Sequence, residues 1–555
     1  MRAITRHVAA LVAVGLLGSV VAAAASGQGG VWNPDRGDGT YVNPVLFADY
    51  SDPDAVRVGD DFYLVSSSFA SVPGLPILRS RDLVNWTIVG HAVARLPSPE
   101  FDTPQHGKGM WAPSLRYRAG RFWIYVADPD RGIYVTTATA ASGPWTPLFL
   151  VKPVRGAIDP CPLWDDDGRM FIVHAWAKSR VGFNSVLTLT PLTADGRRID
   201  GGDVEVFDGH ANHPTIEGPK FYRRNGWYYI MAPAGGVATG WQTVLRSKNV
   251  LGPYEDRIVM RQGTTGVNGP HQGAWVETKS GESWFLHFQD RGAYGRVVHL
   301  QPMVWKDDWP VIGADKDGDG VGEPVATFRK PVAGAPLETP QTSDEFGEKA
   351  LGLQWQWNAN PSPDWASLAA RPGWLRLRSQ SRPAAVKSVF DLSAVLLQKL
   401  PAEEFSVSAR IDAKGLAVGE RVGLVVMGRD TGSIAVQRSA RGLVIVESVG
   451  KGVDSGGGDV DAPDATGTKE VLPTSVVTLR ATFERDGRVR FDVDAGAVKF
   501  KGPGPGFVVR PGVWVGARVG LFASDRGAPG AKAVTRGYAD VDWFHVEHFE
   551  KERIQ

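Results

Sequence analysis

The sequence has almost no cysteine, because Cys161 is the only one among 555 residues. A single thiol excludes an intramolecular disulfide, so the folded state must be stabilised by buried apolar side chains, which a chain of this length can supply. No motif around Cys161 indicates a catalytic thiol. We therefore expect a small, buried side chain there.

The sequence also lacks a net charge of either sign. Its 61 Lys and Arg residues nearly balance its 60 Asp and Glu residues. This balance gives no electrostatic reason to expect a nucleic acid or an anionic membrane as partner. We predict neither.

Long apolar runs are missing after the first 25 residues. Residues 1–7 are basic, residues 8–25 are apolar or small, and three alanines at 23–25 offer a small-x-small cleavage site. This pattern predicts a signal peptide over residues 1–25. We therefore expect a secreted or periplasmic protein with no membrane span after cleavage.

Glycine, proline and tryptophan are abundant, with 66, 38 and 19 residues respectively. Glycine and proline predict many turns and hence many short strands. The tryptophans suggest packed blades, sugar-stacking faces, or both. The composition therefore favours an all-β fold.

A turn glycine followed by an aromatic strand occurs five times, at residues 59–65, 120–126, 168–173, 226–231 and 281–286. The spacing of roughly 50 to 60 residues matches that of propeller blades. A large sandwich or jelly roll is the alternative, but five copies in register favour a propeller. We predict a five-bladed β-propeller over residues 40–332.

The rest of the chain has a different pattern. Residues 333–341 form a proline-spaced linker with no strand or helix period. Beyond it, alternating segments such as residues 405–411 and 477–483 indicate half-buried strands. We predict a concanavalin-like β-sandwich of jelly-roll type over residues 342–550.

Three carboxylates stand in similar contexts. Asp52 and Asp159 directly precede a proline, and Glu217 is followed by glycine and proline. They lie before the aromatic strands of the first, third and fourth copies, so a propeller would bring them together at its axis. Acids that converge in this way suggest acid/base hydrolysis, and glycosidic bonds are the usual target.

Each acid alone also has a structural interpretation. Aspartate before proline is a common turn starter, so Asp52 or Asp159 by itself would indicate little. The nearby acids Asp54, Asp60 and Asp61, and the three at residues 165–167, are expected to be solvated turn residues.

Residues 41 to about 335 resemble the family 43 glycoside hydrolases, which are five-bladed propellers. The resemblance rests on six motifs that occur in order, at residues 50–54, 109–113, 158–160, 216–219, 269–273 and 294–296. The C-terminal region resembles the β-sandwich of the β-xylosidase branch, through residues 397–401 and 422–428.

The resemblance implies a role for each acid. Asp52 would be the general base, Glu217 the general acid, and Asp159 would raise the pKa of the acid and orient substrate. An inverting hydrolase needs one ionised carboxylate to activate water and one protonated acid to release the leaving sugar. A third carboxylate near the acid disfavours its ionisation.

Other residues are implied to bind substrate or metal. Trp111, Arg296 and Phe69 would contact the sugar, although a core tryptophan and a surface ion pair are the alternatives for the first two. His271 would lie near a divalent ion, usually calcium, or would be a hydrogen-bonded core histidine. No cofactor is expected to take part in the chemistry. An acidic loop at residues 315–323 partly matches a calcium loop.

These inferences predict an exo-acting, inverting glycoside hydrolase that releases terminal β-D-xylosyl units from xylo-oligosaccharides or xylan side chains. Its partner would be a hemicellulose-derived oligosaccharide or polysaccharide. An α-L-arabinofuranosidase that debranches arabinoxylan or arabinan is the alternative within the class. A non-catalytic glycan-binding protein is the alternative outside it, but binding alone would not need three converging acids.

Overall fold

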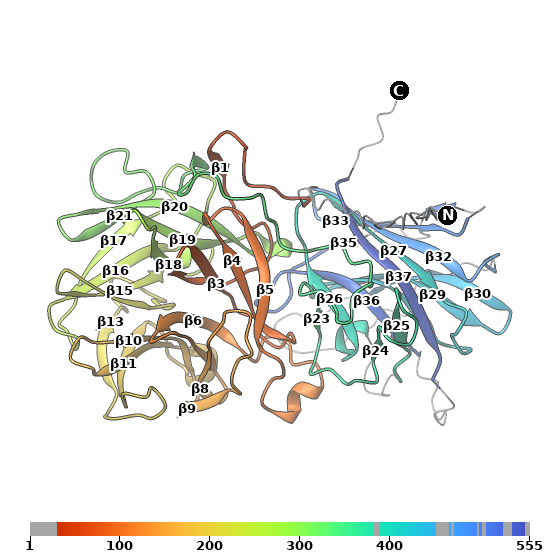
Figure 1. The fold of residues 1–555 in the computed structure, drawn as a ribbon, viewed down its shortest axis with the longest axis horizontal. Coiled ribbons are helices and arrows are strands. Elements are labelled where there is room, and N and C mark those ends of the chain that lie inside the picture. The colour runs from red at the N-terminus through yellow and green to blue at the C-terminus, as the bar shows by residue number, and fades with distance from the viewer. Residues whose placement is uncertain are drawn as a thin grey trace, which may run out of the picture.

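The computed structural model describes residues 30–381, 388–450, 466–467, 471–496, 499–501, 507–525 and 536–549. The predicted signal peptide at residues 1–25 lies outside the described residues. The described chain forms two β-rich bodies side by side, the N-terminal body in red to green and the C-terminal body in cyan to blue (Figure 1).

The N-terminal body is built from five antiparallel sheets, each of four consecutive strands, so the predicted five-bladed propeller is confirmed. The blades are β2 (Asp54–Val58), β3 (Asp61–Val65), β4 (Gly74–Ser80), β5 (Trp86–Val93); β6 (Trp111–Arg118), β7 (Arg121–Asp128), β8 (Gly132–Ala138), β9 (Phe149–Pro153); β10 (Ala157–Trp164), β11 (Met170–Trp176), β12 (Val186–Leu192), β13 (Val204–Asp208); β14 (Lys220–Arg224), β15 (Trp227–Ala234), β16 (Trp241–Ser247), β17 (Glu255–Met260); β18 (His271–Glu277), β19 (Ser283–Asp290), β20 (Arg296–Lys306), β21 (Trp309–Ile312).

The five glycines of the repeated motif occupy the turn between the first and second strand of each blade. Their φ angles lie between 66° and 86°, a region that glycine adopts at little cost. The following aromatic residues enter the second strand and pack between blades. The sequence repeat therefore marks one structural position in each blade.

Aromatic residues also close the turn between the third and fourth strands of three blades. Trp86 donates its indole N–H to the Leu83 carbonyl at 2.9 Å, and Trp145 donates to the Ala141 carbonyl at 3.1 Å. The Tyr254 hydroxyl donates to the Val250 carbonyl at 2.8 Å. Each ring thus buries its apolar part while its polar atom has a partner.

The ring is closed by the two ends of the propeller. Strand β1 (Thr40–Val42) pairs with β22 (Thr327–Arg329). The Asn43 side chain donates to the carbonyls of Leu300 and Val325 at 2.8 Å and accepts from the Leu300 N–H at 2.8 Å. The first and last blades are therefore joined by hydrogen bonds between residues far apart in sequence.

The C-terminal body is a β-sandwich, as predicted. One sheet has the order β23 (Gln356–Trp357), β26 (Val395–Lys399), β36 (Arg518–Ser524), β28 (Arg421–Met427), β29 (Thr431–Ser439), β30 (Gly442–Gly450), β31 (Thr466–Gly467). The other has the order β24 (Ala366–Ser367), β25 (Leu375–Arg378), β37 (Tyr538–Glu547), β27 (Phe405–Asp412), β32 (Val476–Phe483), β33 (Arg488–Asp494), β34 (Lys499–Lys501), with β35 (Phe507–Val508) pairing with β33. Both strands predicted from alternation, β27 and β32, are present and adjacent.

Helices are short in the part of the chain that the structure describes: α1 (Lys178–Val181) and three 3-10 turns, η1 (Pro99–Asp102), η2 (Gly292–Tyr294) and η3 (Val389–Asp391). None of the described helices has the length and apolar character needed to span a membrane.

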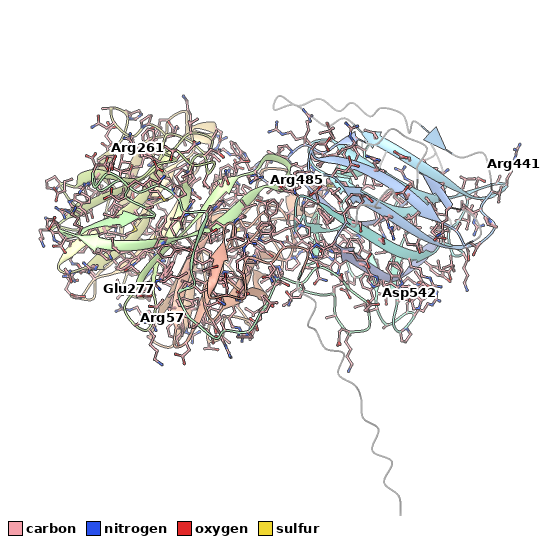
Figure 2. The ribbon with its side chains drawn as sticks, turned by 90° about the horizontal axis from the view of Figure 1, so that it is seen from above. Arg57, Arg261, Glu277, Arg441, Arg485 and Asp542 are labelled. Atoms are coloured by element: carbon pink, nitrogen blue, oxygen red, sulfur yellow. The ribbon has the colours of Figure 1, made fainter. Side chains whose placement is uncertain are left out.

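The two bodies pack against each other. Phe47 and Tyr294 of the propeller belong to the same buried apolar cluster as the sandwich core, and their rings meet edge to face at 5.7 Å. The linker follows the outer strand of the first blade, where the Gln341 side chain bonds both the N–H and the carbonyl of Ile88. Seen from above, Arg441 marks the end of the sandwich farthest from the propeller (Figure 2).

Candidate active site

A residue with positive φ lies in or just before the first part of the innermost strand of every blade. These residues are Asp52 (54°), Ala112 (32°), Asp159 (57°), Gly218 (58°) and Gln272 (24°). The strand pairing shifts register at three of these positions, in the second, third and fifth blades. Such a bulge changes the direction in which the neighbouring side chains point. Here the residues at these positions make contacts between blades.

Asp159 joins three blades at the axis. Its Oδ2 accepts hydrogen bonds from the Gly218 N–H at 2.7 Å and from the Gln272 side-chain amide at 3.0 Å. The residue is only 3 % exposed. Burial, and then the charge of Asp52, raise the pKa of the Asp159 carboxyl to about 7.

Glu217 lies beside Asp159 at the start of the fourth blade. Burial raises the pKa of its carboxyl to about 8, and the charges of Asp159 and Asp52 act in the same direction while Arg296 opposes them. Its side chain is still 28 % exposed, so it can be reached from solvent. Glu217 is therefore a proton donor available at neutral pH.

Asp52 has a different environment. Its Oδ2 accepts a hydrogen bond from the Ser67 hydroxyl at 2.5 Å, and its Oδ1 accepts one from the Arg296 guanidinium at 3.0 Å. Ser67 is itself fixed, because its oxygen accepts the Ala112 N–H at 2.7 Å. Both carboxylate oxygens of Asp52 thus face donors, one of which is a cation.

Arg296 is held from three sides. Its guanidinium contacts Asp52 and lies 4.8 Å from the centre of the Phe288 ring. Its backbone N–H donates to Asp49 Oδ1 at 2.9 Å. The arginine that the resemblance implied is therefore a buried partner of Asp52 and not part of a surface ion pair.

The sandwich reaches this arginine through Asp49. The second oxygen of Asp49 accepts the Gly516 N–H at 2.9 Å, from the loop between β35 and β36. A Cβ on Gly516 would lie 2.7 Å from the Gly295 nitrogen, so only glycine permits this approach. One buried carboxylate thus fixes a propeller residue and a sandwich loop together.

An aromatic group surrounds Trp111, which directly precedes Ala112, the residue bonded to Ser67. The Trp111 ring lies 5.7 Å from Phe69 and 6.2 Å from Trp514, and the Arg180 guanidinium lies 5.1 Å from the Trp111 ring. Trp514 comes from the same sandwich loop as Gly516 and is 51 % exposed. Trp111 and Phe69 were predicted from the sequence, whereas no motif indicated Trp514 or Arg180.

His271 lies next to Glu217, with its Nε2 3.4 Å from the Glu217 Oε1. Both of its ring nitrogens are buried and have no hydrogen-bond partner, so the hydrogen-bonded core histidine is not what the structure shows. Burial, helped by the charge of Arg296, lowers the pKa of the ring to about 3, so the imidazole is neutral.

Two unpaired nitrogens fit a polar occupant such as water or a hydrated cation. The protein offers one imidazole there, so water oxygens would have to complete the shell of a calcium ion. A separate group of three carboxylates, Asp315, Asp317 and Asp319, lies on the partly exposed acidic loop. The backbone carbonyl of Asp319 accepts a hydrogen bond from Arg257 on β17, the outermost strand of the fourth blade, so this loop is attached at the edge of the blade opposite its innermost strand.

Two buried acids outside the group of three contradict the sequence prediction. Asp54 is fully buried and pairs with Arg116 at 2.7 Å, and Asp165 is buried against Arg223, so neither is a solvated turn acid. Cys161 is buried as predicted, and its sulfur accepts from Arg116 at 2.8 Å. Each arginine comes from the blade that follows its acid in the sequence, so the local sequence does not reveal these partners.

Comparison with known proteins gives the class of this site. The Glycosyl hydrolases family 43 profile matches residues 41–310, and the Beta xylosidase C-terminal Concanavalin A-like domain matches residues 343–547. The propeller with its central acids is thus that of a glycoside hydrolase.

Known relatives match this chain over both bodies. A protein of Xylanibacter ruminicola is 46 % identical over 69 % of this chain and 70 % of its own. A Formosa agariphila protein named beta-xylosidase is 32 % identical over 94 % of this chain and 93 % of its own. The crystal structure of the xylan beta-1,4-xylosidase of Bacillus halodurans is 25 % identical, with a TM-score of 0.78 over 91 % of this chain and all of that one. The chain belongs to glycoside hydrolase family 43.

The buried Asp159 carboxyl should make folding stability depend on pH. Its pKa of about 7 in the folded state lies above the ordinary 3.8, so the folded protein holds this proton more tightly than the unfolded chain. Stability contributed in this way is lost as pH rises from about 4 to 7. We expect Asp159→Asn to be more favourable for stability at pH 8 than at pH 5, by at least about 1.4 kcal/mol, the worth of one pKa unit.

Thermal and urea unfolding of wild type and Asp159→Asn at the two pH values measure this difference. Asp317→Asn on the exposed acidic loop is the matched control and should shift stability equally at both. Equal shifts for Asp159→Asn would mean that its carboxyl ionises normally in the folded protein.

Proposed function

We propose that this protein is an exo-acting, inverting glycoside hydrolase that releases terminal β-D-xylosyl units from xylo-oligosaccharides or xylan side chains. The observation that carries the proposal is the contrast between two acids in one pocket. Asp52 is bonded to Arg296 and Ser67, whereas Glu217 has a pKa raised to about 8. One acid is thus set to accept a proton and the other to donate one.

The reaction follows from these two environments. Asp52 removes a proton from water as the water oxygen attacks the anomeric carbon, and Glu217 donates its proton to the departing glycosidic oxygen. The bond to the leaving sugar breaks while the bond to water forms on the opposite face, which inverts the anomeric carbon. Asp159 keeps Glu217 protonated through its nearby carboxyl.

The xylose assignment is supported by relatives named beta-xylosidase. One specific observation favours the alternative, α-L-arabinofuranosidase activity. A Bacteroides ovatus relative, 28 % identical over 93 % of this chain, is named non-reducing end alpha-L-arabinofuranosidase. A non-catalytic glycan-binding protein is disfavoured, since binding gives no reason for a buried acid with a raised pKa.

The remaining expectations belong to the same proposal. Export after cleavage at residues 1–25 would place the enzyme outside the cytoplasm or in the periplasm. No cofactor would enter the chemistry. A hydrated calcium ion at His271 would supply positive charge near Glu217, and the protein residue holding it would be the neutral imidazole.

Paired aryl glycosides test the substrate. The purified protein should hydrolyse an aryl β-D-xylopyranoside with a kcat/KM at least tenfold above that for the aryl α-L-arabinofuranoside. The reverse preference would establish the debranching alternative. Binding of xylo-oligosaccharides without hydrolysis of either glycoside would support the glycan-binding protein instead.

The role of Glu217 is tested with two substrates whose leaving groups differ in their need for protonation. Glu217→Gln cannot donate a proton, so we expect kcat on xylobiose to fall by about 10² to 10⁴. A dinitrophenyl xyloside, whose leaving group needs little protonation, should lose far less. Equal losses of kcat on both substrates would indicate a different proton donor. Circular dichroism serves as the control that the variant is folded.

Trp514 is proposed to hold the sugar beyond the cleaved bond, because it is half exposed and its ring lies beside Trp111. We expect Trp514→Ala to lower kcat/KM for xylotriose about tenfold, equivalent to about 1.4 kcal/mol, with little change for a small aryl xyloside. Trp543→Ala, on the far-side strand β37, is the control. Equal effects on both substrates would contradict the assignment.

A further inference from the structure

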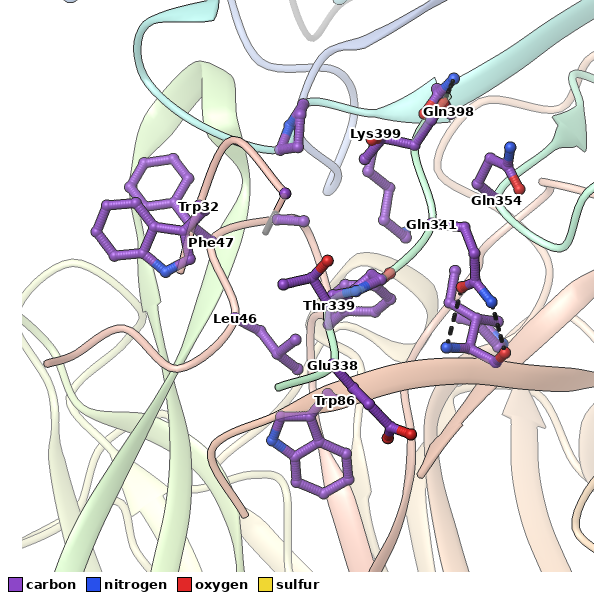
Figure 3. Close-up of a pocket in the computed structure, with 18 of the residues that line it drawn as sticks. Trp32, Leu46, Phe47, Trp86, Glu338, Thr339, Gln341, Gln354, Gln398 and Lys399 are labelled. Atoms are coloured by element: carbon purple, nitrogen blue, oxygen red, sulfur yellow. Dashed lines mark hydrogen bonds between the residues drawn. The ribbon is translucent and has the colours of Figure 1, made fainter. Parts of the chain in front are cut away.

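A second cavity lies between the first blade and the sandwich. It measures about 710 Å³ with its open mouth, and neither Asp52 nor Glu217 lines it. The linker at residues 338–342 forms one side, and the chain leading to the catalytic strand forms another (Figure 3). The cavity is therefore separate from the glycosidase pocket.

Its walls are mainly apolar. Leu46, Phe47, Trp86 and Ile88 line it from the propeller, and Trp32 adds a half-buried indole whose N–H is already bonded to the Pro44 carbonyl. The side-chain amides of Gln341, Gln356 and Gln398, which also line the cavity, donate to backbone carbonyls of neighbouring segments. The walls thus favour a ligand with a flat or ring-shaped apolar body.

One cation faces this apolar space. Lys399, at the end of β26, projects into the cavity at the end opposite Trp86 and Glu338 (Figure 3), with its ammonium 5.2 Å from the Tyr50 ring centre. Within the described parts of the chain, no hydrogen bond or ion pair reaches its ammonium. Burial lowers the pKa of Lys399, the charge of Arg518 acts in the same direction, and the charge of Asp49 opposes both.

The acids nearest to Lys399 already have partners. Both oxygens of Asp49 accept backbone N–H groups, from Arg296 and Gly516. Glu338 pairs with Arg79 at 3.3 Å. Asp49 therefore acts on Lys399 only through its charge at a distance, and no carboxylate among the described residues pairs with the ammonium directly, which leaves its N–H donors to an incoming anion.

Two further polar side chains line the cavity. Gln354 has a buried side-chain oxygen with no partner, which could accept a hydrogen bond from a ligand hydroxyl. His91 also lines the cavity, and burial lowers its pKa to about 4, so it is neutral near pH 7. The net charge facing the cavity from these groups is that of Lys399.

We propose that this cavity binds a small monocarboxylate carried on a six-membered ring, with the carboxylate paired to Lys399 and the ring between the apolar walls. An aromatic acid and a uronic acid share this chemistry. Because most of the lining surface is apolar, the aromatic acid should bind more tightly. The binding does not depend on the proposed glycosidase activity.

Isothermal titration of the full-length protein with cinnamate, D-glucuronate and neutral cinnamamide tests the proposal. We expect cinnamate to bind wild type, Lys399→Met to bind it at least tenfold more weakly, and cinnamamide to bind poorly to both. Lys279→Met, which removes an exposed lysine, is the charge-matched control and should bind like wild type. Thr339→Phe, which fills the cavity from the linker, should also abolish binding.

Each outcome decides the matter. Lysine-dependent binding of glucuronate in preference to cinnamate would support the carboxylate site and identify a sugar acid as its ligand. Equal cinnamate affinity in wild type and Lys399→Met would place the ligand elsewhere and overturn the proposal. No binding of either acid at up to about 10 mM would also overturn it. Thermal unfolding verifies that both cavity variants are folded.

Discussion

The constraint on which this site depends is the repulsion among three carboxylates in one buried pocket. Isolated charges are costly to bury, and three of one sign would be prohibitive. This cost is reduced because the three acids have different environments. Arg296 and Ser67 stabilise Asp52, while Asp159 and Glu217 are left with raised pKa values. Arg296 hydrogen-bonds Asp52 directly, whereas its charge only partly offsets the raised pKa values of Asp159 and Glu217, of which burial is the largest cause.

Backbone geometry imposes the second constraint. Asp52 and Asp159 adopt positive φ, which costs an L-residue on the order of 1–3 kcal/mol and persists only where surrounding structure enforces it. Here the blade behind each residue and the contacts across the axis maintain the positive φ angle. The same position is used in all five blades, by Ala112, Gly218 and Gln272 in the others. Catalytic and supporting residues are thus variants of one structural element.

The sequence was sufficient to predict what is local and repeated. The turn glycines and aromatic strands gave the five blades, and acids followed by proline gave Asp52, Asp159 and Glu217. It failed for what depends on docking between distant segments. Asp54 looks like a turn acid in its local sequence, yet Arg116 from the next blade buries it. Trp514 lies about 400 residues from Trp111, and no short motif relates two such positions.

The sandwich is therefore part of the active site and not only an appended module. Gly516 bonds Asp49 across 467 residues of sequence, and Asp49 in turn fixes the backbone of Arg296. The neighbouring Ala517 N–H donates to the Ala293 carbonyl at 2.7 Å, so the loop is attached on both sides of the arginine's turn. Any displacement of the sandwich would then move Trp514 and loosen Arg296 beside Asp52. The same interface thus holds Trp514 next to Trp111 and the Arg296 backbone next to Asp49.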